Sequence, residues 1–112
     1  MSTPKFVRFL ATSLADLREF PEGARREAGF QIDRVQHGLE PFDWKPMPVI
    51  GQGAREIRVR ELSGAYRVIY LARFDDAIYV LHCFQKKTQK TSLGDIELAT
   101  QRYRDLIRSR ER

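Results

Sequence analysis

The stretch from Gly64 to Thr91, GAYRVIYLARFDDAIYVLHCFQKKTQKT, constrains the fold more than any other part of the chain. It contains two runs of β-branched and aromatic residues, which suit a pleated and largely buried surface. Asp75 and Asp76 separate the two runs, and aspartate is frequent where a hairpin turns. The stretch therefore predicts two adjacent antiparallel strands, and the second of them leads into a cluster of lysines.

The preceding residues predict a short strand and two helices. The strand covers Lys5–Leu10, and Thr12 or Ser13 can cap the first helix. Pro21 suits the first position of the second helix, and Gly38 suits its end. Apolar residues recur at helical spacing in both helices, at Leu14, Leu17 and Phe20 in the first and at Ala24, Ala28, Ile32, Val35 and Leu39 in the second. We expect the two helices to form an antiparallel hairpin.

The stretch Glu40–Gly53 is predicted to be a connector, because its three prolines and two glycines prevent a regular element throughout. Four of its apolar side chains are expected to pack against the sheet or the helices: Trp44, Met47, Val49 and Ile50.

Three strands follow, at about Ala54–Leu62, Ala65–Phe74 and Ala77–Gln85, and their short connections predict an antiparallel meander. The second and third strands are apolar on both faces, as central strands covered on both sides are. Ser92 and Asp95 mark the start of a last helix. Its buried stripe is Ile96, Ala99, Tyr103 and Leu106 or Ile107, and its tail, Arg108–Arg112, is expected to fray. The chain is thus predicted to be one α+β domain, residues 1–112.

Charge and composition narrow the classes of partner. The net charge of +5 comes entirely from residues 55–112, because the acidic and basic residues of the first 54 balance. A basic half favours an anionic partner such as nucleic acid, although many small basic proteins bind nothing anionic. The single cysteine excludes an internal disulfide and fits a reducing compartment. The chain has no signal-peptide pattern and no apolar run near the roughly 20 residues that span a bilayer, so we expect a cytoplasmic protein without membrane contact.

Arginines on the predicted strands are the first candidates for an anion site. Arg58 and Arg60 share one face of the first meander strand, because side chains alternate along a strand. An ordinary solvated face with ion pairs to Glu56 or Glu61 is the alternative. Arg67 lies inside an otherwise apolar strand, where an arginine costs free energy unless it is paired or functional.

Two interpretations of Arg67 remain open from the sequence. Its planar guanidinium suits bidentate phosphate binding. The alternative is a structural salt bridge to a carboxylate such as Glu61 or Asp95. Lys86, Lys87 and Lys90 leave the last strand together, either as a solvated turn or, beside Arg67, as the floor of a positive cleft. Cations in such a cleft would stabilise charge that develops on phosphate oxygens.

His82 and Cys83 are neighbours on a strand and therefore point to opposite faces, which excludes a cysteine–histidine catalytic pair. Cys83 is expected to be a small buried residue. His82 is either a core histidine or a cleft residue that stabilises a phosphate or moves a proton. With one cysteine and two histidines, no metal site and no cofactor site are predicted.

Residues 55–103 resemble the phage-derived HigB-type branch of the RelE/ParE toxin superfamily. The elements that carry the resemblance are Gly-x-Tyr-Arg-Val-x-Tyr, beginning at Gly64, and Phe-x-Lys-Lys-x-x-Lys-Thr, beginning at Phe84. The resemblance implies a compact RelE-like fold and the toxin of a bacterial type II toxin–antitoxin pair. Such toxins enter the ribosomal A site and cut mRNA with the 2′-hydroxyl of the RNA as nucleophile. They are neutralised by an antitoxin, here a helix-turn-helix protein of the HigA type, so we expect a monomer or a toxin–antitoxin hetero-oligomer.

The resemblance also implies roles for individual residues. Arg67 matches the phosphate-stabilising arginine of the family, and Arg58 matches a basic residue that supports acid–base chemistry. Lys86, or Lys87 if the alignment slips by one, matches the cation after the last strand. Glu56 stands where the family uses a lysine, and no tyrosine sits just after the lysine cluster. The residues expected to compensate are His82, Gln85 or Lys90, and those expected to bind RNA are Arg60, Arg73, Lys87 and Lys90.

Two other functions remain compatible with the sequence. A ParE-type toxin that inhibits gyrase would need no cleavage site. A non-catalytic RNA- or protein-binding module would bind with a steep dependence on salt and would cut nothing.

Overall fold

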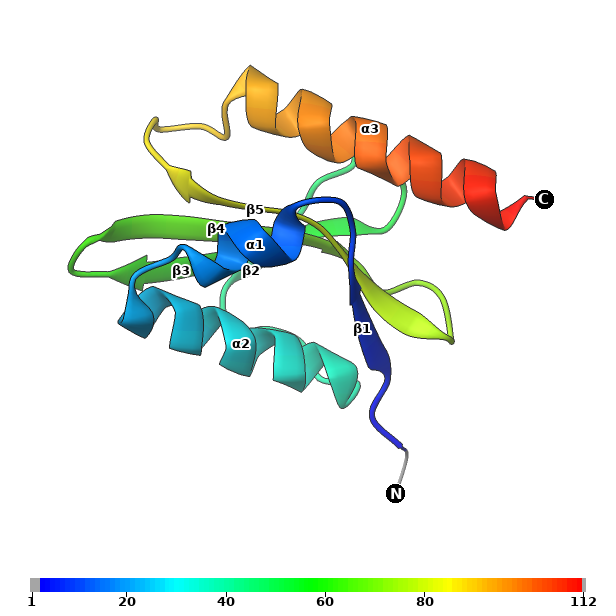
Figure 1. Ribbon diagram of the computed structural model, residues 1–112, viewed down its shortest axis with the longest axis horizontal. Helices are drawn as coiled ribbons and strands as arrows, with labels where there is room; N and C mark the ends of the chain where they lie inside the picture. The colour runs from blue at the N-terminus through cyan, green and yellow to red at the C-terminus, as the bar shows by residue number, and fades with distance from the viewer. Residues whose placement is uncertain (1–2, 112) are drawn as a thin grey trace.

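The computed structural model describes residues 3–111, which form a five-stranded sheet with helices on both faces (Figure 1). The strand order is β1-β5-β4-β3-β2. The strands are β1 (Phe6–Phe9), β2 (Trp44–Pro46), β3 (Ala54–Glu61), β4 (Gly64–Leu71) and β5 (Ala77–Lys86). The helices are α1 (Ser13–Arg18), α2 (Glu22–Gln36) and α3 (Leu93–Arg110).

The predicted meander is confirmed, since β3, β4 and β5 pair antiparallel in sequence order. The observed ends of these strands differ from the predicted ones by at most three residues. β1 pairs parallel with the first half of β5, from Phe6 opposite Ala77 to Phe9 opposite Val80. Two helices and three strands lie between β1 and β5 along the chain, which gives it the length that a parallel pairing requires.

β2 was not predicted, and it lies within the stretch Glu40–Gly53 that was expected to be a connector. Trp44 pairs with Ile57 and Pro46 with Arg55, at the outer edge of the sheet. An edge strand tolerates Pro46 because the missing N–H need not meet another strand. Met47 and Ile50 are buried as expected and Trp44 is half-buried, whereas Val49 is 65% exposed, so its predicted packing was wrong.

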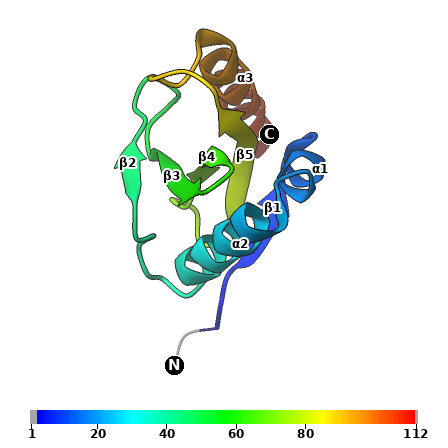
Figure 2. The same ribbon diagram turned by 90° about the vertical axis from the view of Figure 1, so that its left-hand side faces the viewer.

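The helices divide the core into two halves, one on each face of the sheet (Figure 2). The α2 stripe packs on the first face through Ala24, Ala28, Ile32 and Val35. Leu39, predicted to belong to that stripe, is 52% exposed. The reason is that the helix ends before it: Gly38 takes a φ of +82°, which turns the chain away.

α3 packs on the second face, and Ser92 caps it as predicted, accepting a hydrogen bond from the Asp95 backbone N–H. The expected stripe is buried or half-buried, with Ala99 and Leu106 at its centre. The fraying predicted from Arg108 onward was wrong as far as Arg110, which is helical. Its guanidinium donates to both carboxylate oxygens of Asp76 at 3.2 Å and lies 3.8 Å from the Phe74 ring centroid. Arg112 lies outside the described residues.

A β-bulge in β5 decides which side chains face α3. Ile69 pairs with His82 but Tyr70 pairs with Val80, so Leu81 is the extra residue. Leu81 packs in the core under α3, and His82 contacts α3 directly. After the bulge, alternation places Phe84 and Lys86 on this same face and Cys83 on the other. No helix formed by residues 3–111 is long and apolar enough to cross a membrane.

Candidate functional site

Cationic side chains from three neighbouring strands meet at one end of the face that α3 covers. Arg58 is paired with Arg67 across β3 and β4, and Ala65 with Lys86 across β4 and β5. Paired residues of antiparallel strands point to the same face, so these cations share one surface. Figure 1 shows the β3–β4 turn and the loop that follows β5 at the same end of the molecule.

This end of the sheet holds an open cleft of about 390 Å³, which we call the basic cleft. Its lining residues are Arg60, Glu61, Gly64, Ala65, Arg67, Lys86 and Thr88. Three of these residues are cationic and one is acidic, so the cleft suits an anionic group. The structure thus brings Lys86 beside Arg67, the second of the two arrangements considered from the sequence, and adds Arg60 to them.

Arg67 is paired with Glu56 beneath the cleft. The Arg67 Nε lies 3.4 Å from Glu56 Oε1, and both side chains are almost fully buried, at 3% and 1% exposed. The Arg67 Nη1 donates to the backbone oxygen of Tyr66 at 3.0 Å. The structural salt bridge anticipated for Arg67 therefore exists, but its partner is neither Glu61 nor Asp95.

The pKa of Arg67 is lowered from its usual value, chiefly by burial and then by the neighbouring cations Arg58 and Arg60, while Glu56 opposes the change. A guanidinium nevertheless keeps its charge in proteins. A fixed, desolvated cation that lines a cleft interacts strongly with an anion, because little solvent screens it.

Glu56 holds a second group besides Arg67. Its Oε2 accepts a hydrogen bond of 2.7 Å from Thr91 Oγ1, and Thr91 is buried. Thr91 belongs to the loop that carries Lys87 and Lys90, both exposed. Glu56 is therefore the counter-ion of the Arg67 guanidinium and anchors the lysine loop beside the cleft through a hydrogen bond. Glu56 does not line the cleft itself.

Lys86 is half-buried at the rim, and its pKa is lowered from the usual lysine value. Burial is the largest cause and the charge of Arg67 is the next, with Glu56 opposing both. Lys45 contributes to the same lowering. Lys45 is opposite Glu56 in the sheet and so shares this face, and sequence reasoning missed it because β2 was not predicted.

Arg58 is half-buried beside Arg67, and its Nε has no hydrogen-bond partner among residues 3–111. Like charges directly opposite each other on paired strands repel. An anion bound between Arg58 and Arg67 would remove that repulsion and supply the missing acceptor.

Arg73 lies away from the basic cleft. It follows the other end of β4, eight residues from Ala65 along the chain, or roughly 25 Å in extended conformation. Its Nη1 donates to the Tyr103 hydroxyl at 3.2 Å, and its guanidinium lies 4.9 Å from the Phe74 ring centroid. The structure does not bring this predicted RNA-binding residue to the others.

His82 is also outside the basic cleft. It is buried, its Nε2 lies 2.7 Å from Asp95 Oδ1, and its ring stacks on Phe84 at 4.8 Å. It borders a different groove, together with Phe20 of the α1–α2 turn. Cys83 points to the opposite face, and burial raises the pKa of its thiol to about 12. No group of three or more metal-ligating side chains occurs within residues 3–111.

Comparisons with known proteins concern the family and the fold. The family described as "Phage derived protein Gp49-like" matches residues 15–104. No curated protein matches the sequence. Among solved structures, a mutant of the Escherichia coli toxin RelE in the free state superposes with a TM-score of 0.64 at 14% identity, over 93% of this chain and 99% of that one.

A second solved structure is the toxin–antitoxin complex RelBE2 from Mycobacterium tuberculosis. One of its chains matches with a TM-score of 0.50 at 22% identity, over 75% of this chain and 100% of that one. At these identities the likeness establishes the fold, which is the compact RelE-like α+β fold that the sequence predicted.

Proposed function

The chain belongs to the Gp49-like family of phage-derived proteins, and from this premise we propose that it is the toxin of a type II toxin–antitoxin pair. Its proposed activity is ribosome-dependent cleavage of mRNA, in the cytoplasm where ribosomes are. The RelE-like fold supports the proposal, because the same architecture occurs in toxins. The observation that carries it is the basic cleft, in which Arg60, Arg67 and Lys86 converge from three strands.

The proposed reaction needs no cofactor. The 2′-hydroxyl of one nucleotide loses its proton to water and attacks the adjacent phosphorus. The bond from phosphorus to the 5′-oxygen breaks, which leaves a 2′,3′-cyclic phosphate on one fragment and, after protonation, a 5′-hydroxyl on the other. Negative charge develops on the non-bridging oxygens during this step. We assign the stabilisation of that charge to Arg67, which is ion-paired with Glu56, and to Arg58 opposite it.

Lys86 is our candidate for the proton donor to the leaving 5′-oxygen. A lowered pKa makes an ammonium group a better acid near neutral pH, and the surroundings of Lys86 lower its pKa. Arg60, Lys87 and Lys90 are proposed to bind the RNA backbone on either side. Lys45 joins them because it lies on the same face.

Glu56 and His82 take supporting positions in this proposal. Glu56 contacts Arg67 and Thr91 beneath the cleft, so it orients the cation and the lysine loop. His82 is paired with Asp95 and helps to fix the start of α3 on the sheet. Neither side chain is proposed to contact the RNA.

Induced expression in a bacterium tests the proposal. The wild-type chain should arrest growth and produce new mRNA 5′ ends within reading frames. Lys86→Ala should relieve the arrest, whereas Arg104→Ala, which removes an exposed cation of α3, should not. Growth arrest with intact mRNA and stalled gyrase–DNA complexes would instead support a ParE-type activity and reject the nuclease.

The proposed partner is a helix-turn-helix antitoxin of the HigA type encoded next to this chain. Co-expression of the adjacent gene should restore growth and yield a complex that co-purifies with the chain. An adjacent gene product that neither binds nor protects would count against the toxin–antitoxin assignment.

A further inference from the structure

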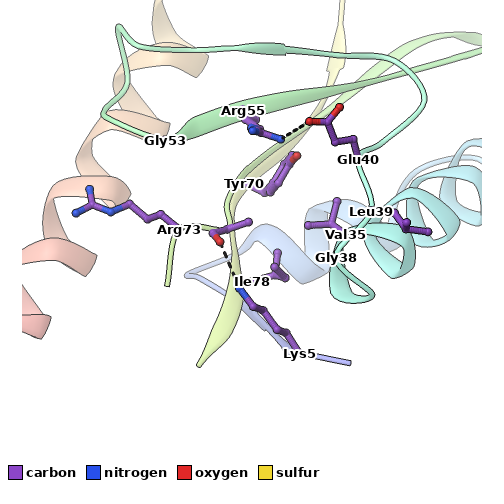
Figure 3. A pocket seen from close by; sticks show the side chains of 11 residues that line it. Lys5, Val35, Gly38, Leu39, Glu40, Gly53, Arg55, Tyr70, Arg73 and Ile78 are labelled. Atoms are coloured by element: carbon purple, nitrogen blue, oxygen red, sulfur yellow. Dashed lines mark hydrogen bonds and ion pairs between the residues drawn. The ribbon is translucent and has the colours of Figure 1, made fainter. Parts of the chain in front are cut away.

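A second cavity, of about 370 Å³, is shown in Figure 3 and shares no lining residue with the basic cleft. It is bordered by Val35 and Leu39 at the end of α2 and by Arg55 and Tyr70 of β3 and β4. Tyr70 belongs to the core beneath α2, on the opposite face of the sheet from the cluster around Arg67. The two sites therefore lie on opposite faces of the sheet and at opposite ends of its strands, so a ligand in one does not contact the other.

Part of this cavity is apolar. Val35, Leu39, Ala72 and Ile78 contribute aliphatic surface. The volume falls within the usual range for small-ligand pockets, about 300–1,000 Å³, at its lower end. An apolar group of the size of a phenyl ring or a short aliphatic chain fits such a space.

A buried hydroxyl points into the polar part of the cavity. Tyr70 is 1% exposed, and its hydroxyl has no hydrogen-bond partner among residues 3–111. In Figure 3 the hydroxyl is directed toward Arg55 and Glu40. Burial raises the pKa of Tyr70 more than the hydrogen bond and the charge of Arg55 lower it, so the hydroxyl stays protonated. Because a guanidinium can only donate, the proton of the hydroxyl is left without an acceptor. Buried polar groups rarely remain without a partner, which marks this hydroxyl as a donor available to a ligand.

Arg55 supplies a second donor with spare capacity. Its guanidinium lies 4.0 Å from the Trp44 ring centroid, which holds it in place. Its ion pair with Glu40 is loose: Arg55 Nη1 and Glu40 Oε1 are 3.9 Å apart, and the Glu40 side chain is 67% exposed. The pairing shows that a carboxylate can approach this position from the mouth of the cavity.

Lys5 also borders the cavity, but its ammonium is already engaged. Its Nζ donates to the backbone oxygen of Phe74 at 2.8 Å and lies 3.4 Å from that of Ala72. The available donors are thus one neutral hydroxyl and one guanidinium, with an apolar wall behind them.

We propose that this cavity binds a carboxylate attached to a small apolar group. The carboxylate lies between the Tyr70 hydroxyl and the Arg55 guanidinium and displaces Glu40, while the apolar part packs against Val35 and Ile78. The carboxylate can come from a free acid or from the C-terminus of a peptide, since both offer the same chemistry.

The probes are benzoate, its neutral analogue benzamide, and a short peptide that ends in phenylalanine with a free or an amidated C-terminus. They are titrated into the isotopically labelled full chain and followed by NMR. Saturable shifts should occur at Leu39, Arg55 and Tyr70 for the two carboxylates and not for the two amides. Tighter binding of the peptide acid than of benzoate identifies a peptide as the source, and the reverse identifies a free acid.

Three variants connect these shifts to the cavity. Tyr70→Phe should weaken benzoate binding by roughly tenfold, since it removes one hydrogen bond to a charged group. It removes only an unpartnered hydroxyl, so its thermal stability should equal or exceed that of the wild type. Glu40→Gln should tighten binding because the competing carboxylate is lost. Lys86→Ala, at the basic cleft, should leave the affinity unchanged.

Two results would overturn the proposal. One is the absence of saturable shifts around Tyr70 with either carboxylate at millimolar concentration. The other is a folded Tyr70→Phe protein that binds benzoate as tightly as the wild type does.

Discussion

Replacement of Glu56 by alanine offers the most quantitative check on the structure beneath the basic cleft. The variant leaves Arg67 charged, 3% exposed and without its carboxylate. Removing one partner of a buried ion pair costs about 3–5 kcal/mol, a large share of the roughly 5–15 kcal/mol that stabilises a domain. Unfolding entropies scale with length, so for 112 residues this cost should lower Tm by roughly 12–20 °C.

The assay is urea and thermal denaturation of the purified variants. The matched control is Glu22→Ala, which also removes a glutamate from an arginine pair, since Glu22 bonds Arg26 at 2.6 Å. Both side chains of that pair are more than 70% exposed, so its loss should cost only about 0.5 kcal/mol. Equal losses for Glu56→Ala and the control would refute the buried pair.

A double variant separates the pair from the packing around it. Glu56→Met combined with Arg67→Met replaces both charges with apolar side chains and should recover most of the stability lost in Glu56→Ala. If the double variant is as unstable as the single one, local packing and not charge burial explains the loss.

Three further predictions concern other parts of the fold. Ser92→Ala should destabilise the protein by about 1 kcal/mol in urea denaturation, because the α3 cap is lost, and an unchanged midpoint would argue against the cap. The Cys83 thiol, with a pKa of about 12, should react with a thiol reagent near neutral pH only after unfolding, and fast reaction of the native protein would contradict its burial. The pKa of Asp76 is lowered first by the hydrogen bond from Tyr79 and then by Arg110, so its stabilising effect is present above the ordinary value of 3.8 and is lost as pH falls through the lowered pKa. Tyr79→Phe should therefore raise the pKa of Asp76 in an NMR titration, because it removes the largest stabilising contact of the carboxylate, and an unchanged pKa would contradict that contact.

The sequence predicted the meander well because its strands combine β-forming residues with clear turn residues at Asp75 and Asp76. It did not predict β2, because Pro46 and its neighbours look like a loop until β3 offers them a partner. The bulge at Leu81 was not predicted either, because one extra residue does not change the pattern of a strand that is apolar on both faces. Both features depend on contacts with residues that are distant in the sequence, and local periodicity does not contain that information.

The candidate site was also predicted only in part. Alternation along strands was enough to predict that Arg58 and Arg60 share a face. Pairing Arg67 with the correct carboxylate needed the register between β3 and β4, and without it Glu56 could not be distinguished from Glu61. Lys45 and Thr91 come from segments without a strong pattern, so only the folded chain brings them beside Glu56.

The most direct test of the proposed activity is a reconstituted bacterial translation reaction with a defined mRNA. The 5′ ends of the RNA are mapped after addition of the purified chain, with ribosomes present or omitted. We predict cleavage only on ribosomes, a loss of activity of at least roughly a hundredfold in Lys86→Ala, and a normal rate in Arg104→Ala. Absence of cleavage by the folded wild-type chain, or full activity of Lys86→Ala, would contradict the assignment of the basic cleft.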